Sequence, residues 1–325
     1  MRRTALAALT LPLALMACDA VEPVTAPADA PEAQLGKNAR GAGGPNALDR
    51  MNAMLEAQDS EYRIAYAEYY TVDAPAEANI ILAKDVGNQL LCLPLPDGSE
   101  FCANFIPDDD RRVAIDLDPN TIDVVVDLAQ GATTSGLSVL ETTAAIERAM
   151  QTWDDRTCST LGIQVAGVPA DIGLIQALEG FGGTGLTFSD IVHAGFLPAA
   201  FFEALLDEPG GGTSILGVTF TLTFTVGDLD GNGLPDVGAR EIYYNDGFAW
   251  ADDGVSHFDF ETVALHEAGH GLSQGHFGTL NFNPKKGTLR ASPLAVMNAG
   301  YTQIQRSLKG TDNGGHCTVW GSWPN

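Results

Sequence analysis

Three of the six histidines of this 325-residue chain lie within one short stretch, at a spacing that suits a zinc ion. His266 and His270 are four residues apart, so on a helix both imidazoles project from one face, one turn apart. Glu267 would then lie beside the metal, where a carboxylate can act as a general base instead of a ligand. His276 follows six residues after His270, beyond the same helical face, so the chain must turn back to deliver it. The stretch therefore predicts a catalytic zinc site with three histidine ligands and Glu267 as its base.

The sequence also indicates which residue is the third ligand and which residues form the turn before it. In thermolysin-like zinc peptidases the third ligand is a glutamate further along the chain. This chain has no glutamate after Glu267, which excludes that arrangement and leaves His276 as the third ligand. Gly271 and Gly275 are available to end the helix and to make the turn.

The stretch 266–276 resembles the HExxHxxGxxH signature of the metzincin zinc peptidases, and its surroundings look most like the matrixin branch. The resemblance implies the same three histidine ligands and the same catalytic glutamate. The glycine of the signature falls on Ser273, which is a departure, because a residue with a side chain in the left-handed conformation costs roughly 1–2 kcal/mol. Gly271 and Gly275 could take over that bend.

A methionine further along the chain adds to the resemblance. Residues 292–297 are similar to the approach to the Met-turn, which underlies the zinc site in metzincins, and they place Met297 in that role. Tyr301 lies close behind. Its distance from Met297 in sequence exceeds the Met-x-Tyr spacing of the astacin-like branch, so we do not expect it to bind the metal.

The surrounding pattern predicts an α+β fold. Residues 141–153 place apolar side chains at helical spacing, and residues 218–226 alternate threonine with apolar residues, as in a half-buried strand. Asp259 is well placed to cap the helix that follows it. Segment 242–250 resembles the segment before the zinc helix in bacterial matrixin-like proteins. The resemblance implies a metzincin-type zincin catalytic domain over residues 136–325, with a twisted mixed sheet, a long helix, a zinc helix and a Met-turn.

Two further segments are interpreted separately from that core. Residues 50–135 hold several predicted strands and a hairpin, and we interpret them as a β-rich N-terminal region, either a separate module or a prosegment. Residues 172–212 are apolar and rich in glycine, and we interpret them as an insertion with helices near 172–178 and 198–206. The strands expected in the N-terminal region are Arg63–Tyr70, Asn79–Lys84, Val113–Leu117 and Thr121–Leu128.

An acidic loop that contains glycine follows the predicted strand 218–226. Its oxygen-bearing side chains stand at positions typical of an EF-hand-like loop, and calcium binds about six to eight such oxygens. Because the flanks are strands, the loop would be a structural calcium site on a β scaffold, and the alternative is an ordinary polar turn. The expected calcium ligands are Asp228, Asp230, Asn232, the carbonyl of Leu234, Asp236 and Glu241.

Residues 1–17 have the pattern of a bacterial signal peptide, with two arginines before an apolar core that is too short to span a membrane as a helix. Residues 15–18 resemble a lipobox, which would make Cys18 the lipidated first residue of the mature chain; ordinary cleavage nearby is the alternative. Residues 18–49, rich in Ala, Pro, Asp and Gly, are expected to form a flexible tether. The protein is thus expected to be exported and lipid-anchored to a membrane of a bacterial cell envelope, periplasmic or surface-facing, or secreted if the lipobox is not used.

The mature chain keeps four cysteines, an even number that suits disulfides in an exported protein. Cys92 and Cys102 flank a Pro-Asp-Gly turn signal, which favours a disulfide that closes a hairpin and leaves Cys158 to pair with Cys317. Sequence alone allows about three pairings. Cys92 also distantly echoes the prosegment cysteine that masks zinc in animal matrixins, which is a rival role for it.

The chain carries 42 acidic and 17 basic residues, a net charge of −25. This excess argues against nucleic acid or anionic lipid as a partner, and it suits divalent cations.

These features predict a zinc-dependent endopeptidase that hydrolyses protein or peptide substrates through a water activated by Glu267, with Zn²⁺ as the catalytic ion and Ca²⁺ as a structural ion. The substrate is expected to lie extended along an edge strand of the sheet, paired by main-chain hydrogen bonds. One alternative, motivated by Ser273 and the acidic surface, is a catalytically weak surface binding protein on a metzincin fold. Another is an adhesion module with a structural zinc, although three histidines leave the fourth metal position open and structural sites are usually closed.

Overall fold

The computed structural model describes residues 46–72, 80–82, 90–94, 100–104, 121–185, 189–206, 209–225, 237–256, 258–283, 285–286 and 288–322. Its centre is a seven-stranded mixed sheet in the order β2-β1-β8-β9-β7-β5-β6. The strands β9, β7, β5 and β6 run parallel to one another, whereas β8 pairs antiparallel with β9, and β1 and β2 continue the sheet in antiparallel pairs. The strands are β1 (Tyr62–Thr71), β2 (Ile80–Leu82), β5 (Thr121–Asp127), β6 (Gly162–Val168), β7 (Ile191–Leu197), β8 (Ile215–Phe224) and β9 (Val237–Asn245).

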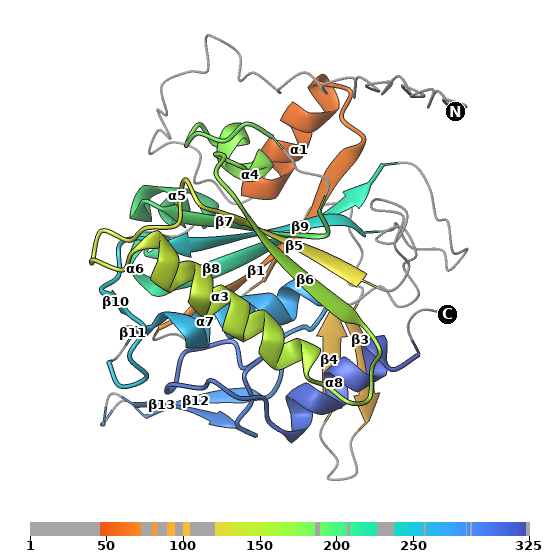
Figure 1. Ribbon diagram of the computed structural model, residues 1–325, viewed down its shortest axis with the longest axis vertical. Coiled ribbons are helices and arrows are strands. Elements are labelled where there is room, and N and C mark those ends of the chain that lie inside the picture. Colours follow the sequence, from red (N-terminus) through yellow and green to blue (C-terminus); the bar gives the residue numbers. More distant parts are fainter. Residues whose placement is uncertain are drawn as a thin grey trace, which may run out of the picture.

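Helices cover both faces of this sheet (Figure 1). On one face α3 and α7 form a hydrophobic core together with the C-terminal part of the chain. On the other face α1, α4 and α5 form a second core. The predicted α+β class is confirmed at this level. The helices that cover the sheet are α1 (Ala47–Ala57), α3 (Val139–Asp154), α4 (Leu174–Leu178), α5 (Ala199–Leu205), α6 (Gly211–Ser214) and α7 (Phe260–Gly271).

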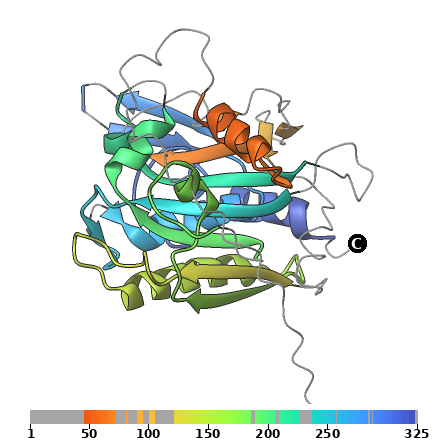
Figure 2. The same cartoon turned by 90° about the horizontal axis from the view of Figure 1, so that it is seen from above.

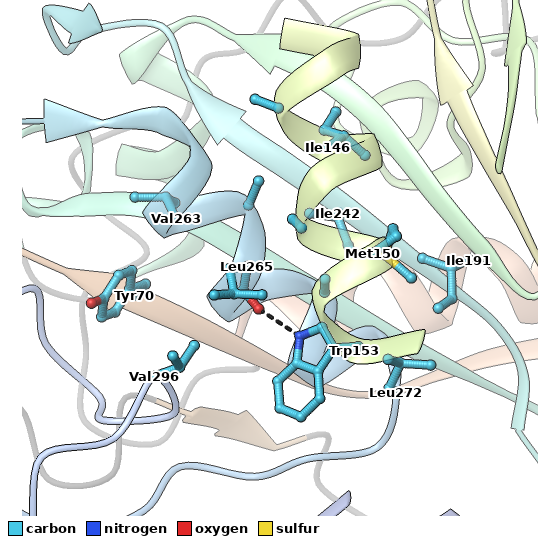
Figure 3. Packing of buried hydrophobic residues seen from close by; sticks show 14 of the residues in the cluster. Tyr70, Ile146, Met150, Trp153, Ile191, Ile242, Val263, Leu265, Leu272 and Val296 are labelled. Atoms are coloured by element: carbon cyan, nitrogen blue, oxygen red, sulfur yellow. Dashed lines mark hydrogen bonds between the residues drawn. The ribbon is translucent and has the colours of Figure 1, made fainter. Parts of the chain in front are cut away.

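The long helix α3 fixes the position of α7. The predicted helix over 141–153 is confirmed, and it begins with a capping box in which Ser138 and Glu141 each bond the other's backbone N–H. At its other end the buried indole of Trp153 donates a hydrogen bond of 2.9 Å to the carbonyl of Leu265 on α7 (Figure 3). A carbonyl inside α7 is thereby tied to α3, which holds the two helices in register.

Smaller elements surround this frame at the C-terminal side. The disulfide between Cys158, just after α3, and Cys317 on α8 is present, with a Cα–Cα distance of 5.6 Å, and confirms that predicted pairing. Cys92 and Cys102 are directly opposite each other on paired strands, which confirms the predicted hairpin, while the bond between them stays a prediction. These elements are β3 (Leu90–Pro94), β4 (Glu100–Asn104), β10 (Trp250–Ala251), β11 (Phe258–Asp259), β12 (Thr279–Asn283), β13 (Thr288–Ser292) and α8 (Gly310–Trp320).

The predicted division of the chain at residue 135 is wrong for the sheet. Figure 2 shows β1 in orange and β5 and β6 in yellow-green on opposite sides of one sheet, so strands from the proposed N-terminal region are part of it. The interpretation of 172–212 as an insertion is also wrong. That segment contains the expected helices α4 and α5, but it also contains β7, which lies between β9 and β5 in the centre of the sheet.

Some predictions fall outside the described residues. The signal peptide, Cys18 and most of the tether lie there, as does the strand expected at 113–117. The tether ends earlier than residue 49, because Asn46 caps α1, which begins at Ala47. Among the described residues, no helix has both the length and the apolar character needed to cross a membrane.

Candidate metal centre

Helix α7 carries the first two predicted ligands and the predicted base. The helix begins after Asp259, whose carboxylate accepts a hydrogen bond of 3.1 Å from the backbone N–H of Thr262, as the sequence predicts for an N-cap. Every residue of α7 is buried, because the sheet, α3 and the C-terminal segment enclose it. The helix is thus a rigid support inside the molecule.

The three predicted histidine ligands meet at one point. The Nε2 atom of His270 lies 3.0 Å from Nε2 of His266 and 3.1 Å from Nε2 of His276. The ligand nitrogens all lie within 4.8 Å of one another. His266 and His270 are fully buried, whereas His276 is partly exposed. The turn after α7 therefore delivers His276 to the other two, as the spacing predicts.

The hydrogen bonds of Nδ1 in His266 and His270 determine whether Nε2 of each ring can bind a metal. Nδ1 of His266 lies 2.7 Å from the carbonyl oxygen of Val296, and Nδ1 of His270 lies 2.7 Å from that of Gln274. A carbonyl only accepts, so in the neutral rings each Nδ1 carries the proton and each Nε2 presents a lone pair. Burial, together with the other two histidines, holds the pKa of His266 well below its ordinary value. Lone pairs that converge on one point fit a shared cation, and this donor set is one that zinc accepts.

Glu267 lies beside this cluster and is fully buried. Its Oε2 accepts a hydrogen bond of 2.7 Å from the hydroxyl of Thr219 on β8, and its Oε1 has no hydrogen-bond partner among the described residues. Space for Oε1 comes from Gly217, where a Cβ would lie 2.7 Å from that oxygen. Burial raises the pKa of Glu267 to about 7. A carboxyl group with this pKa can both take up and release a proton near neutral pH.

The bend that delivers His276 is made by Ser273, which adopts the left-handed conformation with φ of 65°. Its backbone N–H bonds to the carbonyl of His270, and the next N–H, of Gln274, bonds to that of Gly269. The expectation that Gly271 and Gly275 take over the bend is wrong, because Gly271 ends α7 and neither has a positive φ. The residue at the glycine position of the signature therefore keeps the backbone shape despite its side chain.

Met297 packs against the backbone of α7 directly behind the ligands. A Cβ on Gly269 would lie only 2.3 Å from its sulfur, so this glycine lets the methionine approach the helix. The two backbone N–H groups of Val296 and Met297 donate to the carboxylate of Asp312 on α8, at 3.0 and 3.1 Å. The same turn supplies the Val296 carbonyl to His266. The sequence pointed to Met297 but not to the roles of Gly269 and Asp312, because these roles depend on contacts between distant segments.

Strand β1 brings two residues to the centre that the sequence did not single out. The ring of Tyr70 stacks on the imidazole of His266, with centroids 3.9 Å apart and planes 8° from parallel, and Figure 3 shows it on β1 beside α7. A carboxylate oxygen of Glu68 lies 3.2 Å from Nδ1 of His270. Tyr301 is not drawn into the cluster of ligands: its hydroxyl accepts a hydrogen bond of 3.2 Å from the N–H of Asp259.

The proposed calcium site is tested at one residue only. Glu241 is fully buried, and its carboxylate accepts hydrogen bonds from the N–H groups of Leu174 and Ile175, at the start of α4, and from the hydroxyl of Tyr243. Glu241 as a calcium ligand is therefore wrong, because its oxygens are already used inside the second core. The remaining expected ligands lie outside the described residues and stay predictions: Asp228, Asp230, Asn232, Leu234 and Asp236.

No protein-family model matches this chain, and no curated protein matches it in sequence. The function is therefore inferred from the geometry of the centre itself.

Proposed function

We propose that the chain is a zinc-dependent endopeptidase. The observation that carries this proposal is the convergence of three imidazole nitrogens next to a buried carboxylate that does not join them. Three histidine ligands leave one metal position for water or substrate, which is the arrangement of catalytic zinc sites. A binding or structural site has no need for an acid–base group at that place.

The residues divide the work of hydrolysis between them. Zinc bound by His266, His270 and His276 supplies a water whose pKa is lowered to about 7 and a positive charge that polarises the scissile carbonyl. Glu267 takes the proton of the attacking water and passes it to the nitrogen of the leaving amine, so that the peptide C–N bond breaks and no proton is lost. Thr219 holds one oxygen of Glu267 and leaves the other for this transfer.

Three features support a metzincin-type domain as the setting for this chemistry. The long helix α3 packs on α7, Met297 lies in a turn behind the ligands, and Ser273 makes the bend at the glycine position of the signature. Each feature corresponds to one that the resemblance implies. The family assignment is part of the proposal.

A catalytically weak binding protein is the second candidate. The full burial of His266 and Glu267 favours it, because a substrate must reach both. The Oε1 atom of Glu267, which has no hydrogen-bond partner among the described residues, favours catalysis instead, since it can take a proton from a water. Zinc binding without cleavage of any peptide, in a form whose centre is accessible, would establish the second candidate.

Export to a bacterial envelope with a lipid anchor is proposed as the setting, with proteins or peptides as substrates. The disulfide between Cys158 and Cys317 fits an oxidising compartment outside the cytoplasm.

The proposal is tested by replacing Glu267 with glutamine and measuring zinc content and peptide cleavage together. Glu267→Gln is expected to keep one zinc per chain and to lose about 10²–10⁴-fold in turnover, because only the proton transfer is removed. Glu261→Gln is the matched control, a buried carboxylate on the same helix that pairs with Arg148 and Arg306 instead. Unchanged turnover in Glu267→Gln would show that this residue is not the base.

A further inference from the structure

Strand β8 is the strand against which a substrate should pair. Thr219 and Gly217 of β8 both contact Glu267, so a peptide extended beside β8 would pass the predicted base. Extended peptides bind by adding a strand to an open sheet edge. In this structure β8 has no open edge, because β9 pairs with one side and β1 with the other. The sequence-based expectation of an edge strand at the centre is therefore wrong for β8.

The strand that closes this edge is held from two sides, as a bound peptide would be. On one side β1 pairs antiparallel with β8 along its whole length, and Tyr70 stands opposite Gly217. On the other side the N–H of Tyr301 donates a hydrogen bond of 2.7 Å to the carbonyl of Thr71, and Thr71 forms a parallel bridge with Gly300. The end of β1 thus lies between the strand that positions Glu267 and the segment that follows Met297.

The side chains of this end cover the metal ligands. Tyr70 is fully buried with its ring on His266, and Glu68, two residues earlier on the same face of β1, is buried against His270. Beneath them Glu267 has no exposed surface. In this arrangement a peptide cannot reach Glu267 beside β8 while Glu68–Thr71 stays in place.

We propose that the segment Glu68–Thr71 of β1 occupies the substrate position of the metal centre, an inference that rests on the proposed peptidase activity. The structure is then the latent form of the enzyme. A substrate peptide takes the place of this segment beside β8. Because the occupant presents an aromatic ring to His266, the preferred substrate carries an aromatic or large apolar side chain at the position of Tyr70.

The metal site keeps its own supports when this segment leaves. His266 is oriented by the carbonyl of Val296 and His270 by that of Gln274, and neither carbonyl belongs to β1. The segment is also not ideally bound. The hydroxyl of Tyr70 is buried without a hydrogen-bond partner among the described residues, and a buried unpaired group of this kind weakens the closed form.

The other half of β1 is anchored elsewhere and can remain. The side chain of Asn52 on α1 bonds both the N–H and the carbonyl of Ile64, each at 2.8 Å. Register shifts interrupt the pairing with β8 between Ile64 and Tyr66, and again between Tyr70 and Thr71. The part of β1 that contacts α1 thus lies before the first of these shifts, and opening requires movement of the part after it, in which Glu68 also pairs with Ile80 of β2.

The first test weakens the occupant in the full zinc-loaded chain. Tyr70→Ala removes the ring from His266, and we expect cleavage of a quenched peptide library to rise at least about tenfold, because the rate follows the open fraction. Tyr70→Phe is the matched control: it keeps the ring on His266 and removes only the unpaired hydroxyl that weakens the closed form, so its rate should fall below that of the parent and not rise. A Tyr70→Ala protein that is folded and zinc-loaded but no faster than the parent contradicts the proposal.

The second test fixes the occupant in place and does not depend on a weakened core. Tyr69 and Val218 are directly opposite on β1 and β8. The Cα atoms of opposed residues in antiparallel strands are about 4.5–5.5 Å apart, a separation that a disulfide can bridge. Tyr69→Cys combined with Val218→Cys should lose at least about tenfold in rate when oxidised and recover it on reduction. The parent protein under the same reductant is the control. Equal rates in the locked and unlocked states would overturn the proposal.

A third measurement separates this inference from the proposed activity. With cobalt(II) in place of zinc, the visible spectrum reports binding of a tyrosine-containing peptide hydroxamate without any cleavage. The expected result is a spectral change in the reduced double-cysteine and Tyr70→Ala proteins that is absent in the locked protein. That pattern without cleavage in any form refutes the peptidase and keeps the occupant, whereas equal binding to the locked form refutes the occupant alone.

Discussion

At the scale of single residues, the candidate metal centre depends on which ring nitrogen of each histidine carries the proton. The Nδ1–H groups of His266 and His270 are held by carbonyls from two different segments, the turn at Val296 and the bend at Gln274. Both rings are therefore fixed in tautomer and in orientation before a metal arrives. A centre prepared in this way loses little freedom on binding, which favours high affinity for zinc.

The bend at Ser273 gives a prediction about stability. Ser273→Gly and Ser273→Ala both remove the hydroxyl, but only glycine adopts a φ of 65° without strain. We expect the glycine variant to be more stable than the alanine variant by about 1 kcal/mol. Urea unfolding of the two zinc-loaded proteins measures this difference. Equal stabilities would show that the left-handed conformation is not under strain.

Replacing Gly269 by alanine is predicted to change stability in the direction opposite to that of most such substitutions in helices. Glycine to alanine inside a helix normally stabilises by about 1 kcal/mol, but a Cβ here would lie 2.3 Å from the Met297 sulfur and 2.9 Å from the Trp153 ring. Gly269→Ala should therefore destabilise the protein by about 1–3 kcal/mol and weaken zinc binding. Gly271→Ala is the control, since its nearest contact is the flexible end of Ile191 at 3.0 Å. Thermal unfolding and zinc titration check both, and a more stable Gly269→Ala protein would contradict the packing described for Met297.

Spacing along one helix was sufficient to predict that His266 and His270 lie side by side, because they meet through helical geometry alone. The bend was assigned to the wrong residues, because a glycine is the usual choice for a positive φ and Ser273 takes it instead. The roles of Glu68 and Tyr70 could not be predicted, because they reach the centre through strand pairing between distant parts of the chain.

At the scale of elements, helix α7 is held at its first turn by a partly buried ion pair. Asp259, the N-cap, accepts hydrogen bonds from Nε and Nη2 of Arg306, and Glu261 also pairs with Arg306. Burial by itself would raise the pKa of Asp259, but the hydrogen bonds and charge of Arg306, with Thr262, hold it below its ordinary value. The helix that carries the ligands therefore depends on this pair for its start.

Replacing Asp259 by asparagine tests the pair and its pH dependence. Asparagine is also a good N-cap, so Asp259→Asn isolates the ionic contribution, which we expect to be about 1.5–3 kcal/mol at neutral pH. The folded pKa of Asp259 is lowered, so its stabilisation is present above the unfolded pKa near 3.9 and is lost as pH falls through the lower folded value. Urea unfolding of both proteins between about pH 7 and 2.5 should show the gap closing only at the acid end. A constant gap would contradict the ionic origin.

Most elements near the centre could be predicted because the apolar residues of each recur at a regular spacing. The helix α3 repeats its apolar residues at helical spacing, and β8 alternates threonine with apolar residues. Strand β7 was missed, because all of its residues, Ile191–Leu197, are buried and lie between two parallel neighbours. A strand buried on both faces shows no alternation, so an apolar, glycine-rich segment was interpreted as an insertion.

At the scale of the whole molecule, one sheet joins β1 and β2 to the strands from β5 to β9, and the disulfide of Cys158 with Cys317 ties α8 to the segment just after α3. The sheet draws strands from both sides of residue 135, so no boundary there divides it into modules. Sequence could not show this, because strand order depends on pairing between distant segments and not on local pattern. The position of β1 in this sheet is also what connects the N-terminal part of the chain to the metal centre.

The disulfide gives a prediction at this scale. Cys158 and Cys317 are separated by 159 residues, so the bond restricts a large part of the unfolded chain. Replacing both by serine should lower the free energy of unfolding by about 4–5 kcal/mol on the chain-entropy estimate, with zinc content unchanged. Urea unfolding without reductant measures the loss, and the reduced parent protein is the control. A loss below about 1 kcal/mol would show that the bond does not stabilise by restricting the unfolded state.

We propose that three histidines, and no fourth protein ligand, hold a catalytic zinc ion. X-ray absorption at the zinc edge of the full-length, zinc-loaded protein tests it most directly, and it does so whether or not β1 covers the centre. We expect one zinc per chain with three imidazole nitrogens at about 2.0–2.1 Å and one further light atom from water. A zinc closed by four protein ligands, or a chain that binds no zinc with His266, His270 and His276 intact, would contradict it.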